Sequence, residues 1–434
     1  MKTAAYPKYA NYSDSGVEWI GQIPSHWKTK RTGFLLDELN ARSKDGSEPL
    51  LSLSKTQGVI RRDSMAERGG QADSLVGYKI VSENDIVINR MQASNGLLAV
   101  SEVTGITSPD YAIYRIKNDA EIRSDIVVAL LQQAEYQGEI KRRVKGVMEG
   151  FIRLYSDDLF RLPIICAPMQ EQHAIAAFLD KKCAKIDEAV RIKEEQIKLL
   201  HERRQILIQQ AVTRGLNPDA PMKDSGIDWI GKIPAHWSIQ RNFTLFRETK
   251  NSGNANLPVL SVSIHSGVSR EELSAEENIR SIIKIEDRTA YKEVLPGDIA
   301  YNMMRAWQGG IGAVHTHGMV SPAYVVARPI DAMAGDYFEL LYRTPAFIWQ
   351  MDANSKGITD FRKRLYWDDF RDLLTIVPPK AEQQQINHYA GAVSHKVDKA
   401  ISIKRDQITA LKEYKTTLIN AAVTGKIKVT EDGR

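Results

Sequence analysis

The sequence has 434 residues, of which 43% are hydrophobic, and a formal net charge of +5. This length and composition are typical of a globular protein with two domains and exclude a disordered or fibrous chain. The longest apolar run, residues 126–131, is too short for a membrane span, and residues 1–15 lack a signal-peptide pattern, so we expect a cytoplasmic protein without membrane contact.

The chain contains an internal duplication. Residues 14–27, 78–115 and 146–213 return at 224–237, 291–328 and 357–424. Each repeat spans about two hundred residues, which is the size of a domain and far longer than a solenoid repeat. Positions that both halves share therefore indicate common roles, and positions that differ indicate what distinguishes the halves.

Each half begins with short segments whose apolar residues alternate and whose ends carry Gly or Pro, which predicts strands. In the first half these are residues 49–54, 85–89 and 112–114. Their counterparts in the second half are residues 258–263, 298–302 and 324–326.

The apolar period changes after Pro168 and again after Pro379, where steps of three, four and seven residues predict one long helix per half. Gly215 and Pro218 end the first helix and begin a linker. The narrow stripe is typical of a coiled-coil seam, and we expect the two helices to pack antiparallel. The predicted seam residues are Ile186, Val190, Ile197, Leu200, Leu207, Val397, Ile401, Ile408, Leu411 and Leu418.

Two repeated motifs carry a family resemblance. The first is Asp-Ser-Gly-x-x-Trp-Ile-Gly-x-Ile-Pro-x-His-Trp, at residues 14–27 and 224–237. The second opens each long helix, as Pro-Met-Gln-Glu-Gln at 168–172 and Pro-Lys-Ala-Glu-Gln at 379–383. With these motifs, in this order over nearly the whole chain, the sequence resembles the specificity (S) subunit of type I restriction-modification systems, the HsdS family.

The resemblance implies an α+β fold with a pseudo-twofold internal duplication. Two similar mixed α/β target recognition domains would each be followed by a long helix, and the two helices would form an antiparallel coiled coil. The implied boundaries are a first recognition domain at residues 1–167, a central spacer helix at 168–214, a linker with the second recognition domain at 215–378, and a C-terminal spacer helix with its tail at 379–434.

The resemblance also implies a function without catalysis. Each recognition domain would read one half of a split, asymmetric sequence in double-stranded DNA, and the helices would set the gap between the halves. The helices would also dock two methyltransferase (M) subunits and, through them, the restriction (R) subunits. S-adenosylmethionine, ATP and Mg would be bound by those partners, so no cofactor is expected on this chain.

A polar loop after the second predicted strand of each half is a candidate for DNA reading. Asn, Gln and Arg side chains make bidentate contacts to base edges, and loops at strand ends present such side chains. A surface loop with ordinary polar residues is the alternative. The candidates are Asn89, Arg90, Gln92 and Asn95 in the first half and Asn302, Arg305 and Gln308 in the second.

A second candidate segment is Arg-Leu-Tyr, which both halves share at Arg153–Tyr155 and Arg364–Tyr366. A shared Arg and Tyr suit contacts to DNA phosphates, which carry no sequence information. The alternative is structural, with the Arg paired to nearby Asp residues and the Tyr packed at the junction with the helix. The sequence leaves these two interpretations equally open.

Other polar and aromatic features favour structural roles. The Trp and His residues of the long motif, among them Trp27 and His26, are expected to be packing anchors because both halves share them. His315 and His317 have no third ligand nearby, so we expect no metal site. The pattern formed by Asp110 and Glu139 imitates a nuclease motif, but the second half lacks these acids.

No phosphate-binding loop, dinucleotide-binding motif or methyltransferase tetrapeptide occurs, so we predict no catalytic residues. Two alternative functions stay open at this stage. One is an enzyme that acts on DNA through catalytic residues not recognised here. The other is a scaffold whose two domains both bind protein. Several Arg and Lys clusters in each half argue mildly for a polyanionic partner instead.

Overall fold

The computed structural model describes residues 6–64, 74–146, 152–227, 229–254, 256–269, 290–331, 335–357 and 363–429. The chain divides into two compact units. Unit 1 comprises Met1–Glu194 with Arg405–Arg434, and unit 2 comprises Glu195–Lys404. Both divisions fall inside the long helices α4 (Met169–Arg214) and α9 (Lys380–Val423), so each unit contains part of each helix.

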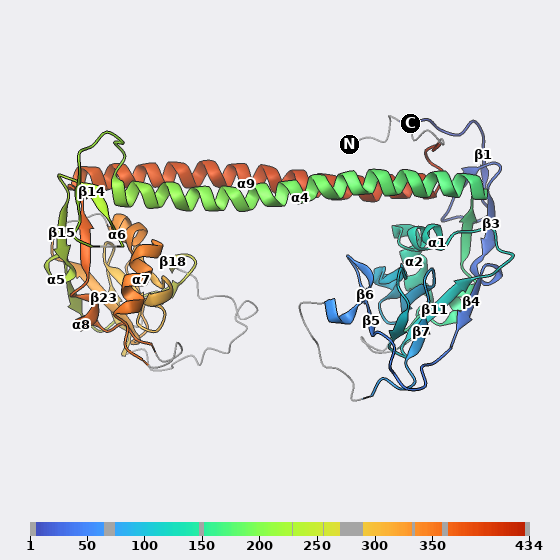
Figure 1. The fold of residues 1–434 in the computed structure, drawn as a ribbon, viewed down its shortest axis with the longest axis horizontal. Coiled ribbons are helices and arrows are strands. Elements are labelled where there is room, and N and C mark those ends of the chain that lie inside the picture. The colour runs from blue at the N-terminus through green and yellow to red at the C-terminus, as the bar shows by residue number, and fades with distance from the viewer. Residues whose placement is uncertain are drawn as a thin grey trace. The chain divides into compact units, whose positions relative to one another are not determined.

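Unit 1 contains twelve of the described strands and three short helices (Figure 1). The strands are β1 (Tyr12–Asp14), β2 (Gln22–Pro24), β3 (Lys28–Arg31), β4 (Leu36–Leu39), β5 (Leu51–Ser54), β6 (Gly58–Arg61), β7 (Lys79–Val81), β8 (Ile86–Asn89), β9 (Leu98–Val100), β10 (Gly105–Thr107), β11 (Tyr111–Ile116) and β12 (Pro163–Cys166). The short helices are α1 (Ser124–Leu131), α2 (Ala134–Arg143) and α3 (Ser156–Phe160).

Unit 2 repeats this series. Its strands are β13 (Met222–Asp224), β14 (Lys232–Pro234), β15 (Ser238–Arg241), β16 (Phe246–Thr249), β17 (Ser261–Ser263), β18 (Gly267–Ser269), β19 (Lys292–Val294), β20 (Ile299–Asn302), β21 (Ile311–Ala313), β22 (Gly318–Val320), β23 (Tyr324–Pro329) and β24 (Leu374–Val377). Its short helices are α5 (Asn242–Leu245), α6 (Gly335–Tyr342), α7 (Pro345–Ala353) and α8 (Trp367–Phe370).

The strand connections are the same in both units. A four-stranded antiparallel sheet has the order β4-β11-β8-β9 in unit 1 and β16-β23-β20-β21 in unit 2. Four two-stranded pairs surround each sheet, and each pair in one unit has its counterpart in the other. The duplication seen in the sequence is therefore a duplication of topology.

The core of each unit lies between its sheet and the long helices. In unit 1, Ile126 and Val127 of α1 pack in one cluster with Ile88 of the sheet and with Ile175 and Phe178 of α4. Figure 1 shows α1 beneath the α4–α9 pair in unit 1 and α6 in the same place in unit 2. Apolar run 126–131 is thus a buried helix, since α1 contributes five buried residues.

The two long helices pack against each other antiparallel within each unit. In unit 1, Lys415 pairs with Asp187 at 2.7 Å and Lys412 with Glu194 at 4.0 Å. In unit 2, Arg204 pairs with Asp398 at 2.8 Å. The ten predicted seam residues are all buried or partly buried, whereas other apolar residues on the helices are exposed: Ile192, Leu199, Ile206 and Ile403.

The two sequence motifs meet in the structure. In unit 1, the Glu171 carboxylate in the first turn of α4 accepts hydrogen bonds from Trp27 Nε1 at 3.0 Å and Tyr9 OH at 2.6 Å, and lies 2.5 Å from His26 Nε2. In unit 2, Glu382 in the first turn of α9 accepts from Trp237 Nε1 at 3.0 Å and lies 2.7 Å from His236 Nε2. The Trp and His residues therefore anchor the helices, in agreement with the structural role predicted for them.

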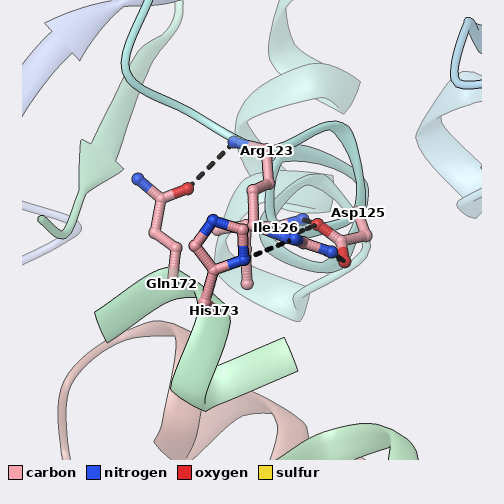
Figure 2. Close-up of polar contacts among 5 residues, drawn as sticks. All are labelled: Arg123, Asp125, Ile126, Gln172 and His173. Carbon is pink, nitrogen blue, oxygen red and sulfur yellow. Dashed lines mark hydrogen bonds and ion pairs between the residues drawn. The ribbon is translucent and has the colours of Figure 1, made fainter. Parts of the chain in front are cut away.

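The glutamine after each of these glutamates is buried and closes the same junction. Gln172 donates to the carbonyl oxygens of Ala167 and Glu121 and accepts from the backbone N–H of Arg123 at 2.9 Å. Figure 2 shows this contact beside the ion pair of Arg123 with Asp125 and the 2.9 Å contact of Arg123 with His173. The first turn of α4 therefore holds the start of α1 in place.

The predicted elements match the described ones in kind and position. The fold class is confirmed, with mixed α+β units and two long, mutually contacting helices at Met169–Arg214 and Lys380–Val423. All six predicted strands occur, each with one or both ends shifted by one to three residues. Within the described residues, no helix combines the length and the apolarity that a membrane span requires.

A test of the helix anchor follows from the pKa of Glu171. Burial favours the neutral acid, but hydrogen bonds from Tyr9, His26 and Trp27 outweigh it and hold the pKa of Glu171 below its usual value. A carboxyl whose pKa is lower in the folded state stabilises the fold above its unfolded pKa and loses this contribution as the pH falls through its folded pKa.

We therefore expect Glu171→Gln to lower the free energy of unfolding in urea at neutral pH by about 1 kcal/mol, given the partial exposure of the carboxylate. The difference from wild type should shrink as the pH falls below the usual range of a glutamate. Glu195→Gln, at an exposed position of α4, is the control. An equal difference at all pH values would show that the charge of Glu171 has no part in anchoring α4.

Candidate nucleic-acid interface

The loop after β8 in unit 1 is held by a buried asparagine. Asn89 Oδ1 accepts hydrogen bonds from the backbone N–H groups of Met91 at 3.0 Å and Gln92 at 3.3 Å. A short 3-10 helix, Ala93–Asn95, follows and ends at Gly96, whose φ of 76° lies in the left-handed region that favours glycine. The loop therefore projects from a fixed base.

The loop after β20 in unit 2 has the same construction. Asn302 Oδ1 accepts from the backbone N–H of Met304 at 3.0 Å, and a 3-10 helix, Ala306–Gln308, ends at Gly309 with a φ of 88°. Asn89 and Asn302, both predicted to contact DNA, thus hold the backbone of their own loops. This local role also accounts for the presence of Asn at the same position in both halves.

The two candidate segments of each half lie side by side. In unit 1, the backbone N–H of Leu154 donates to the Arg90 carbonyl at 2.9 Å. In unit 2, the backbone N–H of Leu365 donates to the Met303 carbonyl at 2.9 Å. Each Arg-Leu-Tyr segment is therefore joined to the loop, although about sixty residues of sequence separate them.

These segments share a backbone frame and exposed tyrosines. Arg153 pairs with Lys145 through two backbone hydrogen bonds, and Arg364 pairs with Lys356 in the same way. Tyr155 and Tyr366, which follow them, are 46% and 48% exposed. Each tyrosine therefore has about half of its surface free, and the choice between a DNA contact and a structural role stays open.

In unit 1, two arginines of the candidate segments form ion pairs. Arg90 is partly buried and forms an ion pair with Glu38, and Arg153 Nη2 lies 3.2 Å from Asp110 Oδ1. Gln92 and Asn95 are exposed beside them. The polar side chains that are most exposed at this loop of unit 1 are therefore the neutral amides of Gln92 and Asn95.

Unit 2 presents a different chemistry on the same frame. Arg305 is exposed and donates to Gln308 Oε1 at 2.7 Å. Lys363 Nζ lies 5.2 Å from the centre of the Trp307 ring and 2.7 Å from Asp352. Ala323 occupies the position of Asp110, so the acid beside the shared arginine of unit 1 is missing here.

Sequence reasoning missed several neighbours of these residues. Glu38, Asp110, Lys363 and Trp307 adjoin the candidates through contacts between distant segments. One signal was available for Asp110, because its replacement by Ala323 is visible in the alignment of the halves. The contact of Arg90 with Glu38 left no such signal.

The residues that imitate a nuclease centre lie in ordinary ion pairs. Asp110 pairs with Arg153, and buried Glu139 pairs with Arg142 and Arg143. His317 lies 3.0 Å from Glu293, and His315 lies 3.6 Å from Asp336. In the part of the chain that the structure describes, no three His, Cys, Asp or Glu residues are grouped to hold a metal ion.

The separation of structural and exposed roles can be tested in unit 2. Asn302→Ala removes the acceptor for the Met304 N–H, so we expect it to destabilise unit 2 by about 1 kcal/mol. Arg305→Ala changes an exposed side chain and should stay within about 0.5 kcal/mol of wild type. Urea unfolding of both variants decides this, and equal losses would contradict the division of roles.

Comparison with known proteins identifies the fold. A scan against protein-family models finds no match, and a search of curated proteins finds none. A solved structure described as the structural basis underlying complex assembly and conformational transition of the type I R-M system is 14% identical, with a TM-score of 0.61, covering 92% of this chain and 98% of its own. The HsdS subunit from Thermoanaerobacter tengcongensis is 15% identical, with a TM-score of 0.51, covering 95% and 100%.

At this level of identity the likeness establishes the fold. It extends over more than nine tenths of the chain and includes both units and both long helices. The resemblance drawn from the repeated motifs is confirmed at the level of structure: this chain has the fold of the type I restriction-modification specificity subunit.

Proposed function

We propose that this chain is the DNA sequence-specificity subunit of a type I restriction-modification complex. The observation that carries the proposal is the fold, which this chain shares over nearly its whole length with an HsdS subunit and with a chain of a type I R-M structure. The proposal keeps the division into recognition domains at residues 1–167 and 215–378 and helical spacers at 168–214 and 379–434.

Two similar interfaces with different side chains suit the reading of a split, asymmetric DNA sequence. The loops of the two units have the same backbone hydrogen bonds but offer mainly amides in unit 1 and an arginine in unit 2. Amides favour adenine and arginine favours guanine in the major groove. The tyrosines and the shared arginines would contact the backbone of the duplex and so fix its register.

The long helices suit the docking of protein subunits. Leu199, Ile206 and Ile403 are exposed on the helices of unit 2, with exposed fractions of 53%, 53% and 48%. Apolar residues at a spacing of seven, as for Leu199 and Ile206, form a stripe that a partner helix can cover. The proposed partners are two methyltransferase subunits, which would carry the catalytic residues and the cofactors.

A protein-binding scaffold and a DNA-acting enzyme are the competing functions. DNA binding that weakens steeply with salt would separate the proposal from a scaffold, because release of counterions from phosphates supplies much of the affinity. Cleavage or methylation of DNA by the purified chain alone would favour the enzyme instead.

The direct test is a map of methylated adenines. The chain is co-expressed with its neighbouring methyltransferase subunit in a host that lacks methylation, with the methyltransferase alone as control. We expect a split, asymmetric motif that appears only when both subunits are present. A chimera in which residues 32–161 come from a relative should change one half of the motif and leave the other half intact.

A stable complex that produces no motif in this host would contradict an active specificity subunit. The loss of both halves of the motif together in the chimera would contradict the assignment of one half-site to each unit. No complex and no motif would favour the scaffold or the enzyme.

A single substitution tests the reading loop of unit 2. Arg305→Ala should relax one base position of one half-site, with a loss of about 1–3 kcal/mol of discrimination, and leave the other half-site unchanged. Lys399→Ala, at an exposed position of α9, removes the same charge as a control. Weaker methylation at all sequences without relaxed specificity would mean that Arg305 contacts phosphate and not a base.

A further inference from the structure

The internal duplication allows each surface of one unit to be compared with its counterpart in the other. The two units differ in how many chain segments cover the end of the helix pair. In unit 1, two chain segments, residues 6–11 and 425–429, cover the end of the helix pair. In unit 2 a single segment, the linker 215–221, occupies the corresponding place.

The two segments of unit 1 contact each other, the neighbouring strand β1 and the helices. The backbone N–H of Lys428 donates to the Pro7 carbonyl at 2.7 Å, and Tyr12 OH donates to the Gly425 carbonyl at 3.0 Å. Ile427 and Val429 are buried in the core of unit 1. The Tyr6 ring packs edge-on against Phe178 of α4, with ring centres 5.4 Å apart.

In unit 2 the covering segment also begins at a glycine just after the helix, but among the described residues no second segment packs beside it. Gly215 has a φ of 75° and lies against Trp237 and Pro234, as Gly425 has a φ of 72° and lies against Trp27 and Pro24. The linker that follows contains no aromatic residue. Its Leu216 is 38% exposed, and Met222 beyond it is 40% exposed.

The helix residues under these segments differ in burial between the two units. Leu418 of unit 1 is fully buried, whereas its counterpart Leu207 is partly exposed. Phe178 is buried, whereas its counterpart Tyr389 is partly exposed. A groove of about 560 Å³ lies here in unit 2, lined by Leu207, Ala211, Arg214, Leu216, Met222 and Tyr389.

We infer that this groove of unit 2 is a docking site for an extended segment of a partner protein that carries an aromatic side chain. Unit 1 shows what such a surface binds, because the counterpart of Tyr389 packs against Tyr6 of an extended segment. The partner's aromatic ring would lie against Tyr389 and cover Leu207. The inference depends on the duplication and not on the proposed DNA-reading function.

A peptide with the sequence of residues 6–12, Tyr-Pro-Lys-Tyr-Ala-Asn-Tyr, is a suitable probe. Labelled with fluorescein, it should bind the full-length chain saturably in an anisotropy titration. The double variant Leu216→Asp with Met222→Asp changes exposed residues and should raise Kd at least about tenfold, since it places charges on the apolar wall. A peptide whose first Tyr is replaced by Ala should lose binding to a similar extent.

Ile330→Asp, an exposed apolar position elsewhere in unit 2, is the matched control and should leave Kd unchanged. Thermal unfolding of each variant shows whether unit 2 stays folded. Absence of saturation with the wild-type chain at millimolar peptide would overturn the inference, as would equal binding by the double variant. Self-association of the wild type that the double variant abolishes, measured by sedimentation velocity, would assign the groove to a second copy and overturn the partner-protein assignment.

Discussion

The carboxylate in the first turn of each long helix is the contact on which each unit depends. Glu171 and Glu382 lie where the helix dipole already favours a negative charge, and each also accepts a hydrogen bond from a buried tryptophan. Because Trp27 and Trp237 belong to the repeated motif, this contact joins the first strands of a unit to the start of its helix. The glutamine that follows donates to the carbonyl of the residue just after the strand that precedes the helix, Ala167 in unit 1 and Pro378 in unit 2, so the junction is fixed from two sides.

The two units share internal hydrogen bonds and ion pairs but differ in the side chains of their loops. Asp85 binds Arg115 through two hydrogen bonds, and Asp298 binds Arg328 in the same way. Lys79 donates to the Tyr111 carbonyl at the start of β11, Lys292 donates to the Tyr324 carbonyl at the start of β23, and burial lowers the pKa of both lysines. The buried members, Asp85, Asp298 and Lys79, are costly to change because each would leave a partner unsatisfied. Loop positions such as Gln92 and Arg305 have no such constraint.

The sequence predicted the elements well because their signals are local. Alternation located the strands ending at Asn89 and Asn302, and the apolar stripe located both long helices almost to the residue. Comparison of the halves went further, since it separated shared positions from variable ones. It set Asn89, which Asn302 repeats, apart from Gln92, which Arg305 replaces. It could not show that Asn89 binds the backbone, because that hydrogen bond depends on the turn.

Contacts between distant segments could not be predicted from one sequence. The hydrogen bond from Leu154 to Arg90 joins two candidate segments, and the pairing of Arg90 with Glu38 lowers its availability to a ligand. Neither contact leaves a periodic pattern, because each depends on how the sheet and its crossovers bring the segments together. The same holds for the groove of unit 2, whose residues are unremarkable in sequence.

That groove has its origin in the connectivity of a duplicated chain. The linker 215–221 joins the two repeats and, among the described segments, is alone in covering the end of the helix pair of unit 2. Unit 1 is covered by two segments, residues 6–11 before the first repeat and residues 425–429 after α9. The apolar surface beneath is inherited by both copies, as Leu207 and Leu418 show. In unit 2 part of that surface is exposed at Leu207 and Tyr389, and this is the surface that we propose another molecule covers.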